Sequence, residues 1–286
     1  MKSKTTLLAS LGLVAAPVIW GFAFVVVKSS LDIIPPLYMM AFRFTIALVG
    51  LMLIYFKRLA EIDKTYVKEG VVLGIFLYLS YLFQTYGCKY TTAGKNAFLT
   101  TIYVVLVPYI NWIICKKKPK SYTVAAAVAA IFGIGLLSLD GNLAINIGDA
   151  LTIVCGVGYA IHMVYVNKYT QNHDPIILTL LQIGITAALS WLTAPVLDGG
   201  FPHSSLTPEG IYSMLYLGLL STMLAYLLQN IGQKYTKPAT AALLLSLESV
   251  FGMLFSVIFL HEVLTVKMIF GCIIIFASIV FSELKN

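Results

Sequence analysis

The chain has 286 residues, of which 59% are hydrophobic and only 11% are charged. Soluble domains carry about 25% charged residues, so this composition excludes a soluble enzyme, a disordered chain and a nucleic-acid-binding protein. Its four cysteines have neither paired spacing nor neighbouring histidines at metal-ligand distance, and we expect neither a metal site nor a cofactor. The composition is typical of a polytopic membrane protein.

Ten apolar segments follow one another along the chain, and each has close to the roughly 20 residues that a membrane-spanning helix needs. The predicted spans are Thr6–Val27, Pro36–Phe56, Glu69–Cys88, Thr92–Cys115, Ser121–Leu139, Gly148–Asn167, Pro175–Leu197, Glu209–Ile231, Pro238–Leu260 and Leu264–Phe281. The connections between them are too short to hold a soluble domain. We therefore expect any function to lie within or between the helices.

The basic residues predict the orientation of the chain in the membrane. If the N-terminus lies inside, the tail and the loops on its side hold fourteen Lys and Arg residues, against four on the opposite side. Cytoplasmic loops carry such an excess, so we expect both termini to lie in the cytoplasm and the protein to reside in the cell membrane. These loops also account for the net charge of +7 without nucleic acid.

The sequence contains an internal repeat. At an offset of 145, residues 81–91 (YLFQTYGCKYT) align with residues 226–236 (YLLQNIGQKYT) and are identical at seven of eleven positions. The identities include Gln, Gly, Lys and Tyr, so shared hydrophobicity does not explain the match.

Earlier segments repeat at an offset of 139, at which Arg43 falls on Gln182. A six-residue insertion around 201–207 reconciles the two offsets. We predict an all-α membrane protein built from two five-helix units, residues 1–139 and 148–286.

Five crossings are an odd number, so the second unit enters the membrane from the opposite side. The two units should then be related by a pseudo-two-fold axis in the membrane plane. Such inverted repeats are typical of secondary transporters, whose substrate site lies between the halves near the membrane midplane. The repeat therefore predicts a secondary transporter that works by alternating access. The sequence has no Walker motif, so we expect no direct use of ATP.

Polar and aromatic side chains recur at helical spacing on faces that the repeat matches. Tyr81 and Gln84 in the third span fall on Tyr226 and Gln229 in the eighth, where the glutamines line a cavity or satisfy helix ends. The candidate substrate-binding residues are Trp20, Tyr81, Gln84, Asn96, Tyr103, Tyr159, His162, Tyr226, Gln229 and Glu248.

Glu248 lies about halfway along the ninth span, where a carboxylate costs about 2.5–3.5 kcal/mol to insert. It either couples transport to protons or binds a substrate amine, or it is a structural carboxylate that pairs with Arg43, Lys95 or a free backbone N–H. Arg43 lies seven residues into the second span, and its side chain is long enough to reach the outer interface, which favours a structural role. The sequence leaves both interpretations of Glu248 open.

The other candidates also have structural alternatives. His162 is either a proton relay or a neutral histidine that hydrogen-bonds between helices. Trp20 and Tyr159, which the offset of 139 aligns, either stack on a substrate or pack between helices. Asn96 and Tyr103 either line a cavity or form interhelical hydrogen bonds.

The expected partners are a small-molecule substrate and the lipid bilayer. Alanines and glycines between Ala125 and Gly135 give the fifth span a face for close helix packing, within the chain or across a homodimer.

With these features assembled, the chain resembles the drug/metabolite transporter superfamily, EamA-type branch, over nearly its whole length. The motifs that carry the resemblance are Trp20-Gly21, Arg43, Lys89–Gly94, Gly148-Asp149, Tyr159–His162, Thr222, Tyr226–Gln229, Lys234–Ala239, Leu247-Glu248 and His261-Glu262. In the family, a proline often follows the glutamate of span nine. This sequence departs from that pattern, because Ser249-Val250 follows Glu248. In the repeat register, Lys117 of the first half falls on Glu262, which we interpret as a structural cap on the turn between spans nine and ten.

The resemblance implies an exporter of small metabolites such as amino acids, with a cavity lined mainly by helices one, three, four, six, eight and nine. Two other classes remain as alternatives. An intramembrane enzyme or lipid-handling protein would need a paired constellation, such as two facing carboxylates, and Glu248 has no second mid-span carboxylate. A membrane scaffold would have no need for polar residues that face its centre.

Overall fold

The computed structural model describes residues 4–116, 118–138 and 146–284, which are helical throughout apart from short connections and contain no strand. Its α-helices are α1 (Lys4–Ser30), α2 (Pro36–Tyr55), α3 (Lys64–Tyr90), α4 (Ala93–Thr100), α5 (Tyr103–Cys115), α6 (Ser121–Ser138), α7 (Ile147–Thr170), α8 (Pro175–Leu197), α9 (Pro208–Leu215), α10 (Ala225–Lys234), α11 (Pro238–Leu245), α12 (Leu247–Leu260) and α13 (Val266–Leu284). Two short 3₁₀ turns, η1 (Phe56–Glu61) and η2 (His203–Ser205), and a π-helix, η3 (Tyr216–Leu224), complete the described chain. The all-α prediction is confirmed.

Within the described residues, eight helical segments are long and apolar enough to cross a membrane. Two shorter apolar stretches, Val124–Gly133 and Val266–Ser278, lie in α6 and α13. The protein is therefore a multi-pass membrane protein, as its composition predicts.

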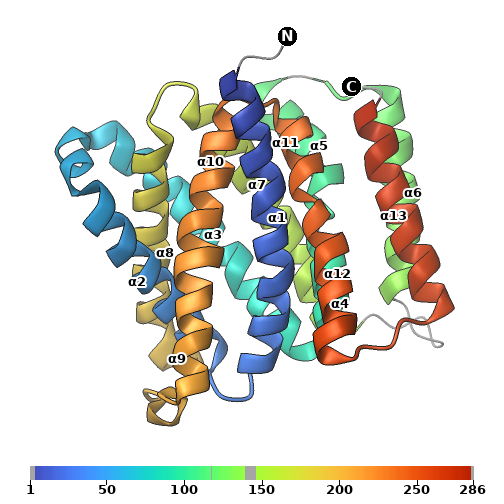
Figure 1. Ribbon diagram of the computed structural model, residues 1–286. Helices are drawn as coiled ribbons and strands as arrows, with labels where there is room; N and C mark the ends of the chain where they lie inside the picture. The colour runs from blue at the N-terminus through green and yellow to red at the C-terminus, as the bar shows by residue number, and fades with distance from the viewer. Residues whose placement is uncertain (1–3, 117, 139–145, 285–286) are drawn as a thin grey trace.

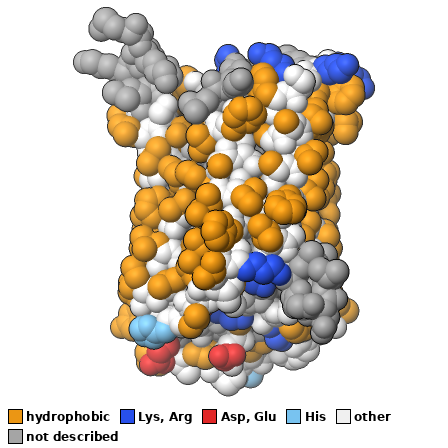
Figure 2. Space-filling view, turned by 90° about the vertical axis from the view of Figure 1, so that its right-hand side faces the viewer, with side chains coloured by type: hydrophobic (Ala, Val, Ile, Leu, Met, Phe, Trp, Pro, Cys, Tyr) orange, Lys and Arg blue, Asp and Glu red, His pale blue; other side chains and the backbone are white. Residues whose placement is uncertain are grey.

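The helices form one upright bundle, with the two chain ends marked at the same end of it (Figure 1). On the face shown in Figure 2, hydrophobic side chains cover the middle, and charged side chains lie mostly toward the two ends. The exposed apolar residues of α6 include Val128, Ile131 and Phe132. An apolar belt between polar ends is the surface that a bilayer requires.

α6 and α13 pack on each other at one side of the bundle (Figure 1). Gly133 of α6 makes this approach close, because a Cβ on it would lie 3.0 Å from the carbonyl oxygen of Gly271 in α13. The small-residue face of the fifth predicted span thus packs within the chain. The homodimer stays a prediction.

Two predicted spans are interrupted, although we expected continuous helices over Thr92–Cys115 and Pro238–Leu260. The first breaks between α4 and α5 and the second at Ser246, between α11 and α12. The hydroxyl of Thr101 donates to the Phe98 carbonyl, and that of Ser246 donates to the Leu243 carbonyl, both at 2.7 Å. Such local bonds satisfy carbonyls that lose their helical partners at a break.

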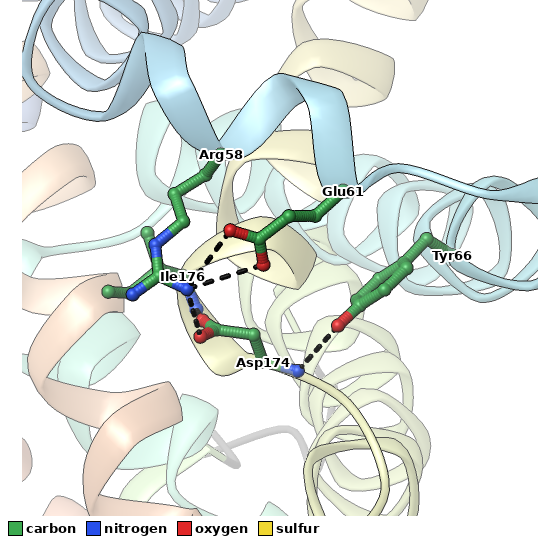
Figure 3. Close-up of polar contacts among 5 residues, drawn as sticks. All are labelled: Arg58, Glu61, Tyr66, Asp174 and Ile176. Atoms are coloured by element: carbon green, nitrogen blue, oxygen red, sulfur yellow. Dashed lines mark hydrogen bonds and ion pairs between the residues drawn. The ribbon is translucent and has the colours of Figure 1, made fainter.

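Polar contacts join η1 and the first turn of α3 to the turn before α8 (Figure 3). The Arg58 guanidinium lies 3.4 Å from the Asp174 carboxylate and 3.3 Å from that of Glu61. The Asp174 backbone N–H donates to the Tyr66 hydroxyl, and the Asp174 carboxylate accepts from the Ile176 backbone N–H as the N-cap of α8. Because Arg58 is solvent-exposed, its ion pairs add little stability, and the cap is the stronger constraint.

The start of α7 lies against the end of α3, and this contact depends on Gly148. A Cβ at this position would lie 2.6 Å from the Tyr90 carbonyl carbon and 2.7 Å from the Gly87 oxygen. We expect Gly148→Ala to lower the free energy of unfolding by about 1–3 kcal/mol, because backbone cannot move aside as a side chain can. Gly200→Ala is the control, since no heavy atom lies within 4 Å of its added Cβ. Thermal unfolding in detergent tests this, and equal midpoints for the two variants would contradict it.

Candidate functional site

An interior cavity lies between helices from both halves of the chain. The cavity has a volume of about 50 Å³, which is room for on the order of four water molecules. The predicted residues that line it come from α1, α3, α4, α5, α7, α10 and α12 and are Trp20, Tyr81, Gln84, Asn96, Tyr103, Tyr159, Tyr226, Gln229 and Glu248. Nine of the ten candidates thus surround one space, and substrate binding by them stays a prediction.

Four aromatic side chains form one wall of the cavity. Trp20 packs against Tyr226 with ring centroids 5.3 Å apart, and Tyr159 packs against Tyr81 at 5.8 Å. These two pairs correspond to each other under the repeat, and the Tyr159 hydroxyl donates to the Gln84 side-chain oxygen. The wall therefore presents apolar ring faces with a small set of hydroxyls.

Tyr103 and Glu248 hold matching positions at the cavity. Each is an early residue of the helix that follows a break, α5 or α12, and the offset of 145 aligns them. Both side chains line the cavity, and Glu248 is buried there. The pairings of Glu248 with Arg43 or Lys95 that the sequence left open do not form, because Arg43 bonds elsewhere and Lys95 lies 3.2 Å from Asp149.

Gln84 and Asn96 form a polar network at the cavity. The Tyr159 hydroxyl donates to the Gln84 side-chain oxygen at 3.0 Å, and the Gln84 amide nitrogen donates to Thr100. The Asn96 amide nitrogen donates to the Thr152 hydroxyl at 2.7 Å. The Asn96 side-chain oxygen is buried and has no hydrogen-bond partner among the described residues. An acceptor left open beside a cavity is suited to a water molecule or a ligand.

His162 is the one candidate that does not line the cavity. It lies one helical turn beyond Tyr159, but its side chain turns toward α8, where Nε2 lies 2.6 Å from the Gln182 side-chain oxygen. Substrate contact by this residue stays a prediction. Its interpretation as an interhelical hydrogen-bonding histidine agrees with this position.

Arg43 lines the cavity, although we expected it to reach the outer interface. Its Nε donates to the Thr222 hydroxyl at 2.9 Å and one Nη donates to the Ser221 hydroxyl at 2.8 Å. Both partners lie in the π-helix η3, where Thr222 also donates to the Leu217 carbonyl and the Ser221 carbonyl accepts from the Trp20 indole. The wider turn presents these groups to α1 and α2, and no sequence periodicity signals it.

Glu262 stabilises a helix end in the opposite half of the chain. Its two carboxylate oxygens accept from the backbone N–H groups of Ala93 at 2.7 Å and Gly94 at 3.0 Å. These are free N–H groups in the first turn of α4, which carry partial positive charge. The structural role is as predicted, but the carboxylate caps α4 and not the turn between spans nine and ten.

The fold and the cavity define a multi-pass helical membrane protein with a polar, aromatic-lined space inside an apolar bundle. The model of the EamA-like transporter family matches residues 7–139 and 146–284. The chain belongs to this family and is a transporter, as the resemblance to EamA-type drug/metabolite transporters implies.

Several proteins are similar along most of their length. An uncharacterized transporter of Archaeoglobus fulgidus is 35% identical, and the match covers 98% of this chain and 87% of that protein. A protein of Salmonella typhimurium described as a probable amino-acid metabolite efflux pump is 25% identical, with 92% and 90% covered. A crystal structure with 17% sequence identity superposes with a TM-score of 0.72 over 97% of this chain and 96% of the other, which shows a shared fold.

Thiol accessibility tests whether the cavity is hydrated. In a background without the four native cysteines, we expect Gln84→Cys to react with a small water-soluble thiol reagent, because residue 84 lines the cavity. Ser80→Cys is the matched control, one turn away on α3 but fully buried against α7. Equal labelling of both cysteines, measured by mass spectrometry, would contradict a water-filled cavity at this wall.

Proposed function

We propose that this protein is a secondary transporter that exports a small organic metabolite, an amino acid or a related compound, across the cell membrane. The observation that carries the proposal is the cavity, in which matched residues of two repeated units, such as Tyr81 and Tyr226, surround a polar space inside an apolar bundle. The relative described as a probable amino-acid metabolite efflux pump supports the substrate class and the direction.

The proposed architecture is ten membrane crossings, with α6 and α13 included, arranged as two inverted repeats over residues 1–139 and 148–286. The helix boundaries support it, because the offset of 145 maps α4 onto α11 and α5 onto all of α12 except its first residue. The same offset maps Lys116 onto His261, and both have left-handed backbone, with φ of 60° and 53°. Packing supports it as well: α1 packs on α10 and α12 as α7 packs on α3 and α5.

Alternating access would follow from rocking of the two repeats about the central cavity. Both termini would lie in the cytoplasm, on the side with the basic loops. The aromatic wall would hold the apolar part of the substrate, and the amides of Gln84, Asn96 and Gln229 would bind its polar groups. Nucleic acid has no part in this function.

Glu248 is the proposed coupling group. It is the one carboxylate among the residues that line the cavity. A proton and a substrate amine would compete for this carboxylate, so that proton binding on one side promotes release of the substrate there. An intramembrane hydrolase would need a second carboxylate or a nucleophile–base pair, and the lining residues include neither.

Transport measurements test the proposal. In proteoliposomes supplied with a pool of amino acids and related metabolites, we expect at least one solute to accumulate, and only when a pH gradient is imposed. Glu248→Gln should abolish the gradient dependence, because an amide keeps the shape of the side chain but cannot carry the proton.

Glu209→Gln is the control, since Glu209 is solvent-exposed in the first turn of α9. Full gradient dependence in Glu248→Gln would refute the coupling role and leave the transporter. Failure of the folded wild-type protein to move any solute would count against transport itself and favour the lipid-handling alternative.

A further inference from the structure

Arg43 is a cation buried in the wall of the cavity. Its side chain is 3% exposed, and it lines the cavity together with Tyr81 and Ser221. A guanidinium inside a membrane bundle is costly unless another group compensates its charge, and such residues mark functional sites.

The partners of Arg43 within the described chain are all neutral. The hydroxyls of Ser221 and Thr222 accept two of its N–H groups, and the Tyr81 ring centroid lies 4.8 Å from the guanidinium carbon. The ion pairs of the described residues involve Arg58, Lys95 and His173, and none includes Arg43. Hydroxyls and a ring hold the guanidinium in place, but they do not neutralise its charge.

The bonds to Ser221 and Thr222 use two of the five N–H groups that a guanidinium carries. The planar fork of a guanidinium matches the two oxygens of a carboxylate, so the remaining groups of Arg43 suit a bidentate anion. The charged residues among those that line the cavity are Arg43 and Glu248. Arg43 would complement a carboxylate of the solute, and Glu248 would complement its amine. A phosphate ester carries nearly two negative charges, so a single Arg would not balance its charge and Glu248 would repel it.

We infer that the transported solute carries a carboxylate group and that Arg43 binds it. This inference rests on the proposed transport function and narrows its substrate class to carboxylates, with α-amino acids as the simplest members. The repeat provides one such position only, because the aligned residue, Gln182, bonds to His162 outside the cavity. The fold thus accepts glutamine at the corresponding place in its second half, which makes Arg43→Gln a suitable variant.

Chemical labelling of Arg43 tests the inference without relying on transport. The chain contains two arginines, so Arg58→Lys leaves Arg43 as the one target of the arginine reagent p-hydroxyphenylglyoxal. The probes are L-leucine, L-threonine, L-glutamine, L-phenylalanine and the amide of each, which keeps the amine and loses the carboxylate. We expect at least one acid to slow labelling of Arg43 about tenfold at saturation, as charge-assisted binding implies, while its amide does not.

Uptake into proteoliposomes is measured in parallel with the same probes. Arg43→Gln should lower uptake of the protecting acid about tenfold or more, and Arg43→Lys should lose less, because it keeps the charge without the fork. A residue that only holds η3 in place would respond to acids and amides alike.

Protection by the amides equal to that by the acids, or no protection by any acid, would overturn the carboxylate site even if solutes are taken up. Protection by an acid without uptake of any solute would uphold the site and remove the transport function. Uptake of an amide at the rate of its acid would show that the protein does not recognise the carboxylate of the substrate. This result would also overturn the inference.

Discussion

The interior of a bilayer offers no water to a backbone amide, so the backbone polar groups of this bundle must bond within the protein. Most of the backbone meets this constraint by remaining helical. At the two breaks, the hydroxyls of Thr101 and Ser246 satisfy carbonyls locally. The residues that follow these breaks, Tyr103 and Glu248, both line the cavity. The site is thus a consequence of where the helices are interrupted.

The cavity combines near symmetry with a few decisive asymmetries. The aromatic pairs Trp20–Tyr226 and Tyr159–Tyr81 repeat the same contact in both halves. Charge does not repeat, because the residue that the repeat aligns with Glu248 is Tyr103 and not a second glutamate. In the proposed transport mechanism, symmetric packing would let the two halves exchange conformations, and asymmetric charge would give a bound solute one orientation.

The repeat made much of the site predictable. Tyr81 and Gln229 in the aligned segments line the cavity. Helical spacing and the repeat both single them out in the sequence, so their position could be predicted. Residues whose side-chain direction depends on a neighbouring helix were predicted less well. His162 shares a helix face with Tyr159, but its side chain bonds to Gln182 of α8. The Arg43 side chain was expected to reach the outer membrane interface, but it bonds to η3. Helical periodicity gives the face of a residue and not the partner that its side chain selects.

The sequence by itself determined the apolar segments, the repeat and the class of protein, because hydropathy and self-similarity are properties of the chain alone. Only the tertiary structure decided the π-helix that receives Arg43, the breaks within two spans and the capping of α4 by Glu262. The π-helix and the cap involve contacts between segments far apart in the chain. Inside a membrane a polar group bonds to whichever partner the packing brings within reach, and that choice is made only when the helices come together.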